Sequence, residues 1–168
     1  MNLNITRRSF LTKLATFAAG AMVLAACGGS APAPAAAPAN TAGGAAVTLH
    51  IGSKGDELLF DKTALEAPAG SKITLRFKNN ATVASTLHNW VLAASASAAD
   101  GIAADGIAAG EAAGYVKAAD NRVIVKTKMI KGGETDSITF DAPKAGTYTF
   151  VCTFPGHAAL MKGTLTIK

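Results

Sequence analysis

The segment Gly146-Thr-Tyr-Thr-Phe-Val-Cys-Thr-Phe-Pro-Gly-His-Ala-Ala-Leu-Met-Lys-Gly-Thr-Leu-Thr-Ile167 decides the fold of this chain. At each end, apolar residues alternate with mostly polar ones, and this period of two predicts two half-buried strands. The alternating positions are Tyr148, Phe150 and Cys152 before the loop and Leu165 and Ile167 after it. Between the strands, Cys152, His157 and Met161 lie within ten residues. A loop that joins two strands can therefore bring a thiol, an imidazole and a thioether to one point.

The same alternation appears elsewhere in residues 47–168. Ile73, Leu75 and Phe77 alternate with polar residues, as do Ile138 and Phe140. Turn signals separate these runs at Ala69-Gly70, Asn79-Asn80, Gly132-Gly133 and Lys144-Ala145-Gly146. Short strands separated by such turns predict an all-β fold, a Greek-key β-sandwich.

One segment, 93–120, lacks this period and is rich in Ala and Gly. It contains an internal echo, Asp-Gly-Ile-Ala-Ala at 100–104 and again at 105–109. We expect a short helical insertion, one or two helices packed on the sandwich.

Residues 1–27 predict an export signal that ends in a lipidated cysteine. Arg7-Arg8 precede an apolar stretch, Leu14 to Ala26, that is shorter than the roughly 20 residues needed to cross a bilayer. A basic start, a short apolar run and small residues before the cleavage point are typical of signal peptides. Leu24-Ala25-Ala26-Cys27 resembles a bacterial lipobox, so acyl chains on Cys27 are expected to anchor the protein. Both twin-arginine and general secretory export remain open.

Residues 28–46 are rich in Pro, Ala and Gly and have nothing to bury, which predicts a tether. At about 3 Å per residue its full reach is on the order of 50–60 Å. The remaining residues, 47–168, are enough for one folded domain.

The charge of the chain excludes one class of partner. The formal net charge is +5, but Arg7, Arg8 and Lys13 lie in the expected signal. The remainder has 13 basic and 11 acidic side chains, a net charge of +2. A balance this small and scattered gives no basis for binding nucleic acid.

Four side chains form a candidate metal site: Cys152, His157 and Met161 of the loop, and His88 from Leu87-His88-Asn89-Trp90. Two His, one Cys and a weak axial Met are the ligand set of a type 1 (blue) copper site. Zinc also accepts Cys and His, but structural zinc rarely uses Met and the usual CxxC pairs are absent from this sequence. A thiol nucleophile is disfavoured, because Cys152 and His157 are close together on one loop with no adjoining oxyanion motif.

Two of these motifs resemble azurin, a blue copper protein of the cupredoxin family. The run from Cys152 to Leu165 is similar to its copper loop, and His88-Asn89-Trp90-Val91-Leu92 is similar to its first-ligand segment. The resemblance extends through 121–128 and 136–141 and so covers most of 47–168. A lipoprotein leader and a Pro/Ala tether on such a domain resemble the auracyanins, the blue copper proteins of filamentous anoxygenic phototrophs.

The resemblance implies a role for each site residue. His88 and His157 are expected to bind copper through imidazole nitrogen and Cys152 through its thiolate, with Met161 farther away on the axis. Asn89 is expected to hydrogen-bond to the Cys152 loop, and a backbone N–H near Phe154 to donate to the sulfur.

Two departures from azurin appear in this sequence. Leu87 stands where azurin has a glycine whose carbonyl approaches the copper, so that fifth interaction is left open. The azurin disulfide has no counterpart, and the two cysteines of the chain, Cys27 and Cys152, are not expected to pair.

The resemblance also implies a function: a monomer, not an enzyme, that carries single electrons on the outer, periplasmic face of the cell membrane. The partners implied are a membrane quinol-oxidising complex and a c-type cytochrome or reaction centre of a photosynthetic chain. Electrons are expected to leave through His157, within an apolar patch formed by Phe154, Pro155, Gly156, Ala158, Ala159 and Leu160. Copper storage or delivery is the alternative, although the sequence has no Met-rich or His-rich tract. His50 matches no ligand motif and is expected to be an ordinary strand residue.

Overall fold

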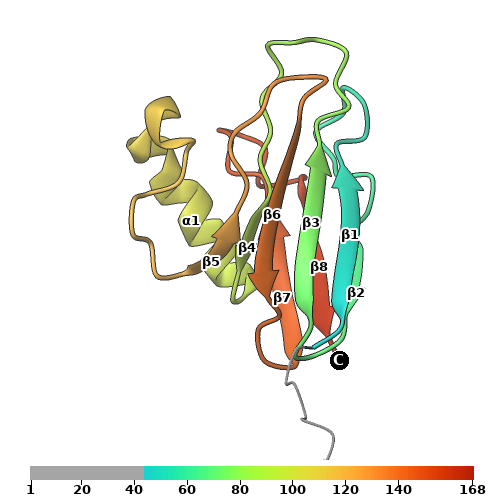
Figure 1. Cartoon of the computed structure of the whole chain (residues 1–168). Coiled ribbons are helices and arrows are strands. Elements are labelled where there is room, and N and C mark those ends of the chain that lie inside the picture. Colours follow the sequence, from blue (N-terminus) through green and yellow to red (C-terminus); the bar gives the residue numbers. More distant parts are fainter. Residues whose placement is uncertain (1–43) are drawn as a thin grey trace, which may run out of the picture. The chain divides into compact units, whose positions relative to one another are not determined.

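The computed structural model describes residues 44–168, so the expected signal and all but the end of the expected tether lie outside the described residues. The described part forms two facing β-sheets, with one helix beside the strands (Figure 1). The fold class predicted from the alternating pattern, a β-sandwich with a short helical insertion, is confirmed.

The strands divide into a sheet of three and a sheet of five. The first sheet has the order β1 (Ala46–Gly52), β3 (Lys72–Lys78), β6 (Thr135–Asp141). The second has the order β2 (Ala64–Ala67), β8 (Lys162–Ile167), β7 (Gly146–Val151), β4 (Val91–Ala93), β5 (Val123–Lys126). β1 pairs with β3 and β2 with β8 in parallel, and the other pairs are antiparallel. The two strands of the deciding segment, β7 and β8, are therefore neighbours, joined by the loop that carries the candidate ligands.

The core lies between the two sheets. Ile73, Leu75 and Phe77 of β3 are fully buried there, as the period of two predicts. The Phe150 ring of β7 lies 5.7 Å from the ring of Trp90 and 5.2 Å from that of Phe60, centroid to centroid. Edge-to-face and offset ring packing of this kind stabilises a core beyond the area that it buries.

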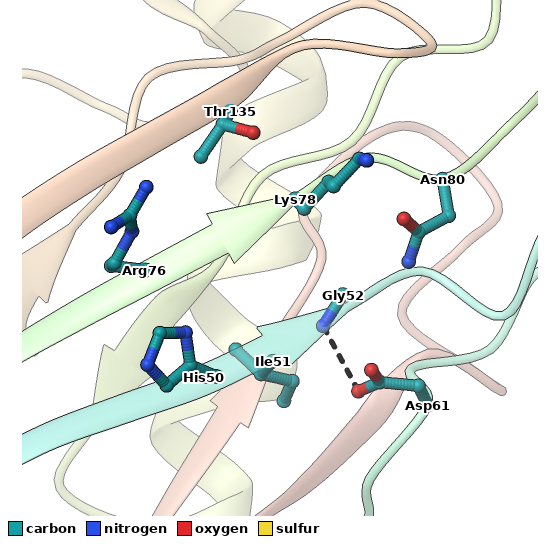
Figure 2. Close-up of a pocket in the computed structure, with 8 residues that line it drawn as sticks. All are labelled: His50, Ile51, Gly52, Asp61, Arg76, Lys78, Asn80 and Thr135. Atoms are coloured by element: carbon teal, nitrogen blue, oxygen red, sulfur yellow. Dashed lines mark hydrogen bonds between the residues drawn. The ribbon is translucent and has the colours of Figure 1, made fainter.

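His50 lies on the exposed face of β1, opposite Arg76 of β3 (Figure 2). Since β1 belongs to the three-stranded sheet, His50 is not part of the loop that follows β7.

The insertion forms α1 (Ala96–Ala109) and a short 3-10 turn, η1 (Glu111–Ala113). The Ser95 hydroxyl accepts a hydrogen bond from the Ala98 N–H and so caps the start of α1. The helix buries Ala99 and Ile102 against β4 and β7. The expectation that β7 is half-buried is wrong at Val151, which is fully buried because α1 covers that face. Within residues 44–168, no helix is long and apolar enough to cross a membrane.

The two copies of the repeat Asp-Gly-Ile-Ala-Ala, at 100–104 and 105–109, place their glycines next to different neighbours in the fold. Residues five apart on a helix are rotated by about 140° from each other, so the copies do not share a face. Ile102 is buried, for example, whereas Ile107 is 59% exposed. A Cβ at Gly106 would lie 2.1 Å from the carbonyl oxygen of Tyr115, while a Cβ at Gly101 would meet only the end of the Arg122 side chain.

Gly106→Ala is expected to lower the free energy of unfolding by about 1–3 kcal/mol, because the backbone at Tyr115 must move to admit the methyl group. Gly101→Ala makes the same chemical change, but the flexible Arg122 side chain can yield. The helix-propensity gain of up to about 1 kcal/mol should then leave Gly101→Ala neutral or slightly stabilised. Urea unfolding of both variants measures the difference, and equal losses would contradict this packing.

Candidate metal centre

A tight turn in the loop after β7 sets the position of His157. The His157 N–H donates to the Phe154 carbonyl at 3.0 Å, which closes a four-residue turn with Pro155 and Gly156 at its centre. Gly156 has φ of 84°, close to the value that a type II turn requires at its third position. Proline is favoured at the second position and glycine at the third, so Pro-Gly defines this turn chemically. His157 is therefore directed back toward the end of β7.

Backbone hydrogen bonds close the rest of the loop. The Cys152 N–H donates to the Met161 carbonyl at 3.0 Å, and the Met161 N–H donates to the His157 carbonyl at 2.8 Å. Met161 is fully buried within the core cluster that also contains Cys152. The three candidate ligands of this loop are thus held close together by the main chain.

His88 reaches the site from a different part of the chain. It precedes β4 and forms an antiparallel bridge with Ile130, in which each residue donates its N–H to the other's carbonyl, at 3.1 and 2.9 Å. β4 is a neighbour of β7, so this bridge places His88 beside Cys152 although 64 residues separate them. The His88 side chain is fully buried.

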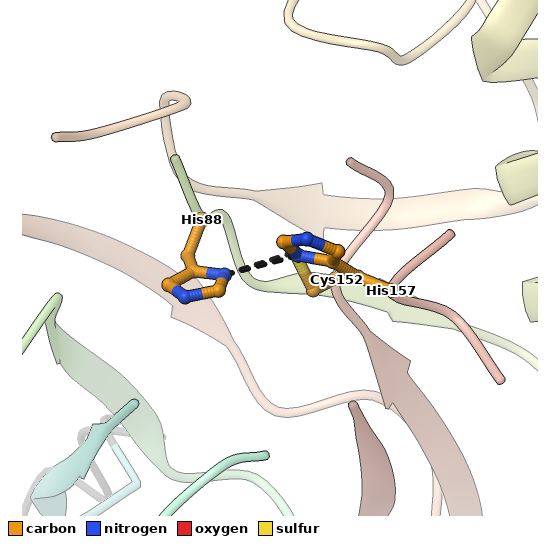
Figure 3. A group of neighbouring side chains, drawn as sticks. All are labelled: His88, Cys152 and His157. Carbon is orange, nitrogen blue, oxygen red and sulfur yellow. Dashed lines mark hydrogen bonds between the residues drawn. The ribbon is translucent and has the colours of Figure 1, made fainter. Parts of the chain in front are cut away.

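The three side chains converge on one point (Figure 3). The two Nδ1 atoms lie 3.2 Å apart, and the Cys152 Sγ lies 3.7 Å from the Nδ1 of His88 and 3.6 Å from that of His157. The centre of this triangle is about 2 Å from each atom, which is close to the length of bonds from a metal ion to imidazole nitrogen and thiolate sulfur.

The donor set fits a metal ion in its chemistry as well. Two imidazole nitrogens and one sulfur face each other inside the protein. Without a metal ion, only a shared proton could bridge any two of these atoms. Within the described residues, the other ring nitrogen of His88, Nε2, is buried without a hydrogen-bond partner. Its Nδ1 is the ring nitrogen that faces the site, since this atom lies close to the Cys152 Sγ and to the Nδ1 of His157.

Asn89 links the two parts of the site. Its Oδ1 accepts the Thr153 N–H at 2.9 Å, and its Nδ2 donates to the Thr153 hydroxyl at 2.8 Å and to the Gly114 carbonyl at 3.3 Å. Both Asn89 and Thr153 are buried. The residue after one candidate ligand is thus bonded to the residue after another, across the two strands.

Burial controls the protonation of the three groups. It raises the pKa of the Cys152 thiol to about 11, although backbone N–H groups of Asn89 and Phe154 donate to the sulfur and oppose the rise. Burial, and then repulsion from a charged His157, lowers the pKa of His88 to about 4. Burial likewise lowers the pKa of His157. Burial alone favours neutral groups, and a metal cation would supply the charge that stabilises the thiolate.

For three contacts at the site, the sequence did not identify the partner. Thr153 was not singled out, although its N–H and hydroxyl are the partners of Asn89. The Phe154 ring lies 4.6 Å from the His157 ring and 5.3 Å from the Tyr115 ring, centroid to centroid. Tyr115 belongs to the insertion, whose Ala/Gly-rich sequence has no pattern that could place it near the loop.

The metal-free protein is expected to lose stability as the pH falls from about 6.5 toward 4. In this window an unfolded chain protonates His88 but the folded one does not, so acid favours unfolding. The full loss expected from His88, reached below pH 4, is on the order of 3 kcal/mol, and about 2 kcal/mol of it is expected between pH 7 and pH 5. Urea unfolding at pH 7 and pH 5, followed by the fluorescence of the single tryptophan, Trp90, measures it. Copper loading should flatten the dependence, because metal and proton compete for the same nitrogen atoms. A metal-free protein of equal stability at both pH values would contradict the assignment of His88 as a buried group that stays neutral in the folded protein.

Comparisons with known proteins agree with this geometry. Residues 47–168 match the family model of copper binding proteins, plastocyanin/azurin family. Auracyanin-A of Chloroflexus aurantiacus is 45% identical over 156 residues, which cover 92% of this chain and 94% of the relative. Azurin of Bordetella pertussis is 45% identical over 122 residues, which cover 67% of this chain and 78% of the relative. The solved structure of auracyanin A, a "blue" copper protein from the green thermophilic photosynthetic bacterium Chloroflexus aurantiacus, matches 73% of this chain and 99% of its own length, with 47% identity and a TM-score of 0.70.

Proposed function

This chain belongs to the plastocyanin/azurin family of copper-binding proteins, and we propose that it shuttles single electrons between membrane redox complexes through one type 1 copper ion. The observation that carries the proposal is the convergence of two imidazole nitrogens and one buried thiol on a single point. Like its relatives, the chain is an electron carrier and not an enzyme.

We assign His88, Cys152 and His157 as the residues that would hold copper most strongly, and Met161 as the residue that would supply a weaker thioether ligand. Copper in such a site cycles between Cu(I) and Cu(II), since thiolate favours the first state and imidazole accepts both. Asn89 holds the ligand loop to the His88 strand, and the N–H of Phe154 polarises the sulfur. Residues that orient ligands in this way limit the rearrangement of the site when the metal changes charge.

His157 is the proposed exit for the electron. Its side chain is 7% exposed, whereas His88 and Cys152 are fully buried. The sequence assigned the surrounding apolar patch to the loop alone. The structure adds α1, because Ala103, Ala104 and Ile107 line a groove of about 230 Å³ together with loop residues. Leu160, 62% exposed, and Ile107 are the large apolar side chains that a redox partner would cover here.

Ile107→Lys is expected to slow electron exchange with a physiological redox partner by about tenfold, because a charge must then be desolvated at the contact. Ile124→Lys places the same charge on β5, away from the groove, and should leave the rate nearly unchanged. Stopped-flow mixing with the oxidised partner gives both rates. Equal slowing by the two variants would contradict the proposal that α1 is part of the docking surface.

The leader and tether are proposed to hold this shuttle at a membrane. Cleavage before Cys27 and acylation of that residue would anchor the chain on the outer face of the cell membrane, with residues 28–46 as the tether. The match to Auracyanin-A supports this layout, since it covers 92% of this chain whereas that to azurin covers 67%. A photosynthetic chain, with a quinol-oxidising complex as donor and a c-type cytochrome or reaction centre as acceptor, is the proposed setting, and the chain is proposed to act as a monomer.

A redox titration of the copper-loaded protein tests the proposed function. We expect the blue absorbance to disappear on addition of one electron per copper and to return fully on oxidation, over repeated cycles. A copper storage or delivery protein would instead release Cu(I) to a chelator on reduction and fail to recover its colour. That outcome would contradict the electron-carrier proposal.

A further inference from the structure

The outer face of the β1–β3–β6 sheet carries basic side chains that the copper site does not use. Arg76 and Lys78 project from β3, the central strand, and His50 lies beside Arg76 on β1 (Figure 2). Lys62, in the β1–β2 connection, donates from its Nζ to the His50 carbonyl at the sheet edge. Within residues 44–168, Arg76, Lys78 and Lys62 form no ion pair, so their charges face solvent. These four residues are called the basic face below.

Uncharged polar groups adjoin the basic face. Thr135 and Asn80 line, together with part of it, a shallow depression of about 450 Å³. Asp61 is the one acidic residue of that lining, and its Oδ1 accepts the Gly52 N–H at 2.9 Å (Figure 2). The face therefore offers positive charge and hydrogen-bond donors together, which is the chemistry that binds phosphate groups.

The basic face offers no large apolar anchor. The large apolar side chains that are exposed in residues 44–168 are Leu58, Val83, Ile107, Ile124 and Leu160, and none of them lies on β1, β3 or β6. An occupant of this face would therefore be held by charge and hydrogen bonds. Such an occupant presents several negative charges to Arg76, Lys78 and Lys62.

The position of the basic face argues against a redox protein as its occupant. The proposed electron exit, His157, lies on the loop between β7 and β8 of the other sheet. A redox centre docked on the outer face of the β1–β3–β6 sheet would be separated from the copper by the sandwich, and electron transfer weakens steeply with distance. An occupant that exchanges no electrons fits this face better.

We propose that the basic face binds the phosphate groups of an anionic phospholipid surface and so holds the domain on its side against the membrane, with His157 free for redox partners. This inference rests on the proposed lipid anchor. The tether leads directly into β1, and His50 lies about 13 Å along that strand from Ala46. A flexible tether of 19 residues, the length of 28–46, would span about 25 Å on average, which is enough to let the face reach the membrane.

Each Lys or Arg near an anionic surface contributes about 1 kcal/mol, and the basic face has three of them, so the unanchored domain should bind only weakly. A lipid-anchored tether raises the effective concentration of the domain at the membrane, so that even a weak contact is occupied much of the time. The lipid anchor would attach the protein to the membrane, and the basic face would set the orientation of the domain on it.

Vesicle binding by the unanchored, copper-loaded unit 40–168 tests the proposal. Both core clusters lie within this unit, and the matching auracyanin A structure is an independent chain of the same domain. We expect co-sedimentation with phosphatidylglycerol-containing vesicles and none with pure phosphatidylcholine. Binding should fall as salt rises from 0.01 M to 0.1 M, where the screening length drops from about 30 Å to about 10 Å. Arg76→Glu with Lys78→Glu should weaken binding at least about tenfold.

Lys126→Glu with Lys144→Glu, which makes the same charge change at exposed positions elsewhere, is the matched control and should bind within about twofold of wild type. The blue spectrum and the redox titration of both variants report whether the fold and the electron-carrier function are intact, independently of vesicles. Equal binding by the two double variants, or no binding to anionic vesicles at 0.01 M salt, would overturn the proposal. Binding to an acidic protein but not to anionic vesicles would assign the face to a protein partner instead.

Discussion

Replacing Cys152 with serine is expected to abolish the intense blue absorbance of the copper-loaded protein. The colour of a type 1 site arises from charge transfer between the thiolate sulfur and Cu(II), and a serine hydroxyl cannot supply it. Cys152 is the only described cysteine, and its sulfur is one of the three converging donor atoms. We expect the visible band to fall more than about tenfold and the copper hyperfine splitting in the EPR spectrum to widen toward that of ordinary Cu(II) complexes.

Met161→Leu is the matched control, because it also changes a fully buried sulfur-containing residue of the same loop. The axial ligand is weak, so this variant should remain blue while its reduction potential shifts. The fluorescence of Trp90 reports the fold of both variants. A blue band that survives Cys152→Ser in a folded protein would refute the ligand assignment.

Asn89→Ala is expected to cause the second large effect, a loss of about 2–4 kcal/mol in the free energy of unfolding of the metal-free protein. The substitution removes three hydrogen bonds and leaves the Thr153 N–H buried without its partner. It should also weaken copper binding by about 10–100-fold, because the loop after Cys152 is no longer tied to the residue after His88. Urea unfolding and a competitive copper titration measure the two effects.

Thr153→Val removes only the hydroxyl partner of Asn89 and keeps the backbone bond at 2.9 Å. It should therefore cost less than half as much stability and leave copper affinity within a few fold of wild type. Equal effects of the two variants would mean that the side-chain bond, and not the backbone bond, holds the loop. If neither variant changed copper affinity, the proposed positioning role of Asn89 would be wrong.

Much of the fold was predictable because its signals are local. The alternation around Ile73, Leu75 and Phe77 describes one strand with one buried face, and the structure confirms it. The turn before His157 was not singled out from the sequence, although its signal is equally local, since Pro155-Gly156 favours one backbone geometry. Val151 was misjudged because the element that buries it, α1, lies about fifty residues away and consists largely of alanine and glycine.

The resemblance to azurin and auracyanin, drawn from two motifs, is confirmed over 47–168, and copper as the metal is confirmed with it. The contribution of Ile107 to the groove between α1 and the loop after β7 could not be predicted. Its echo partner, Ile102, has the same neighbours in sequence but is buried, because the two residues point in different directions from the helix.

The sequence by itself determined the strand pattern, the identities of the sulfur and nitrogen donors, and the turn that directs His157 toward Cys152. Each of these depends on residues within one short segment, where side-chain type and backbone preference suffice. Only the tertiary structure decided that His88 meets Cys152, that Asn89 bonds to Thr153, and that Arg76 lines up with His50 on one outer face. These contacts depend on strand order and register, which arise from the packing of the whole sandwich.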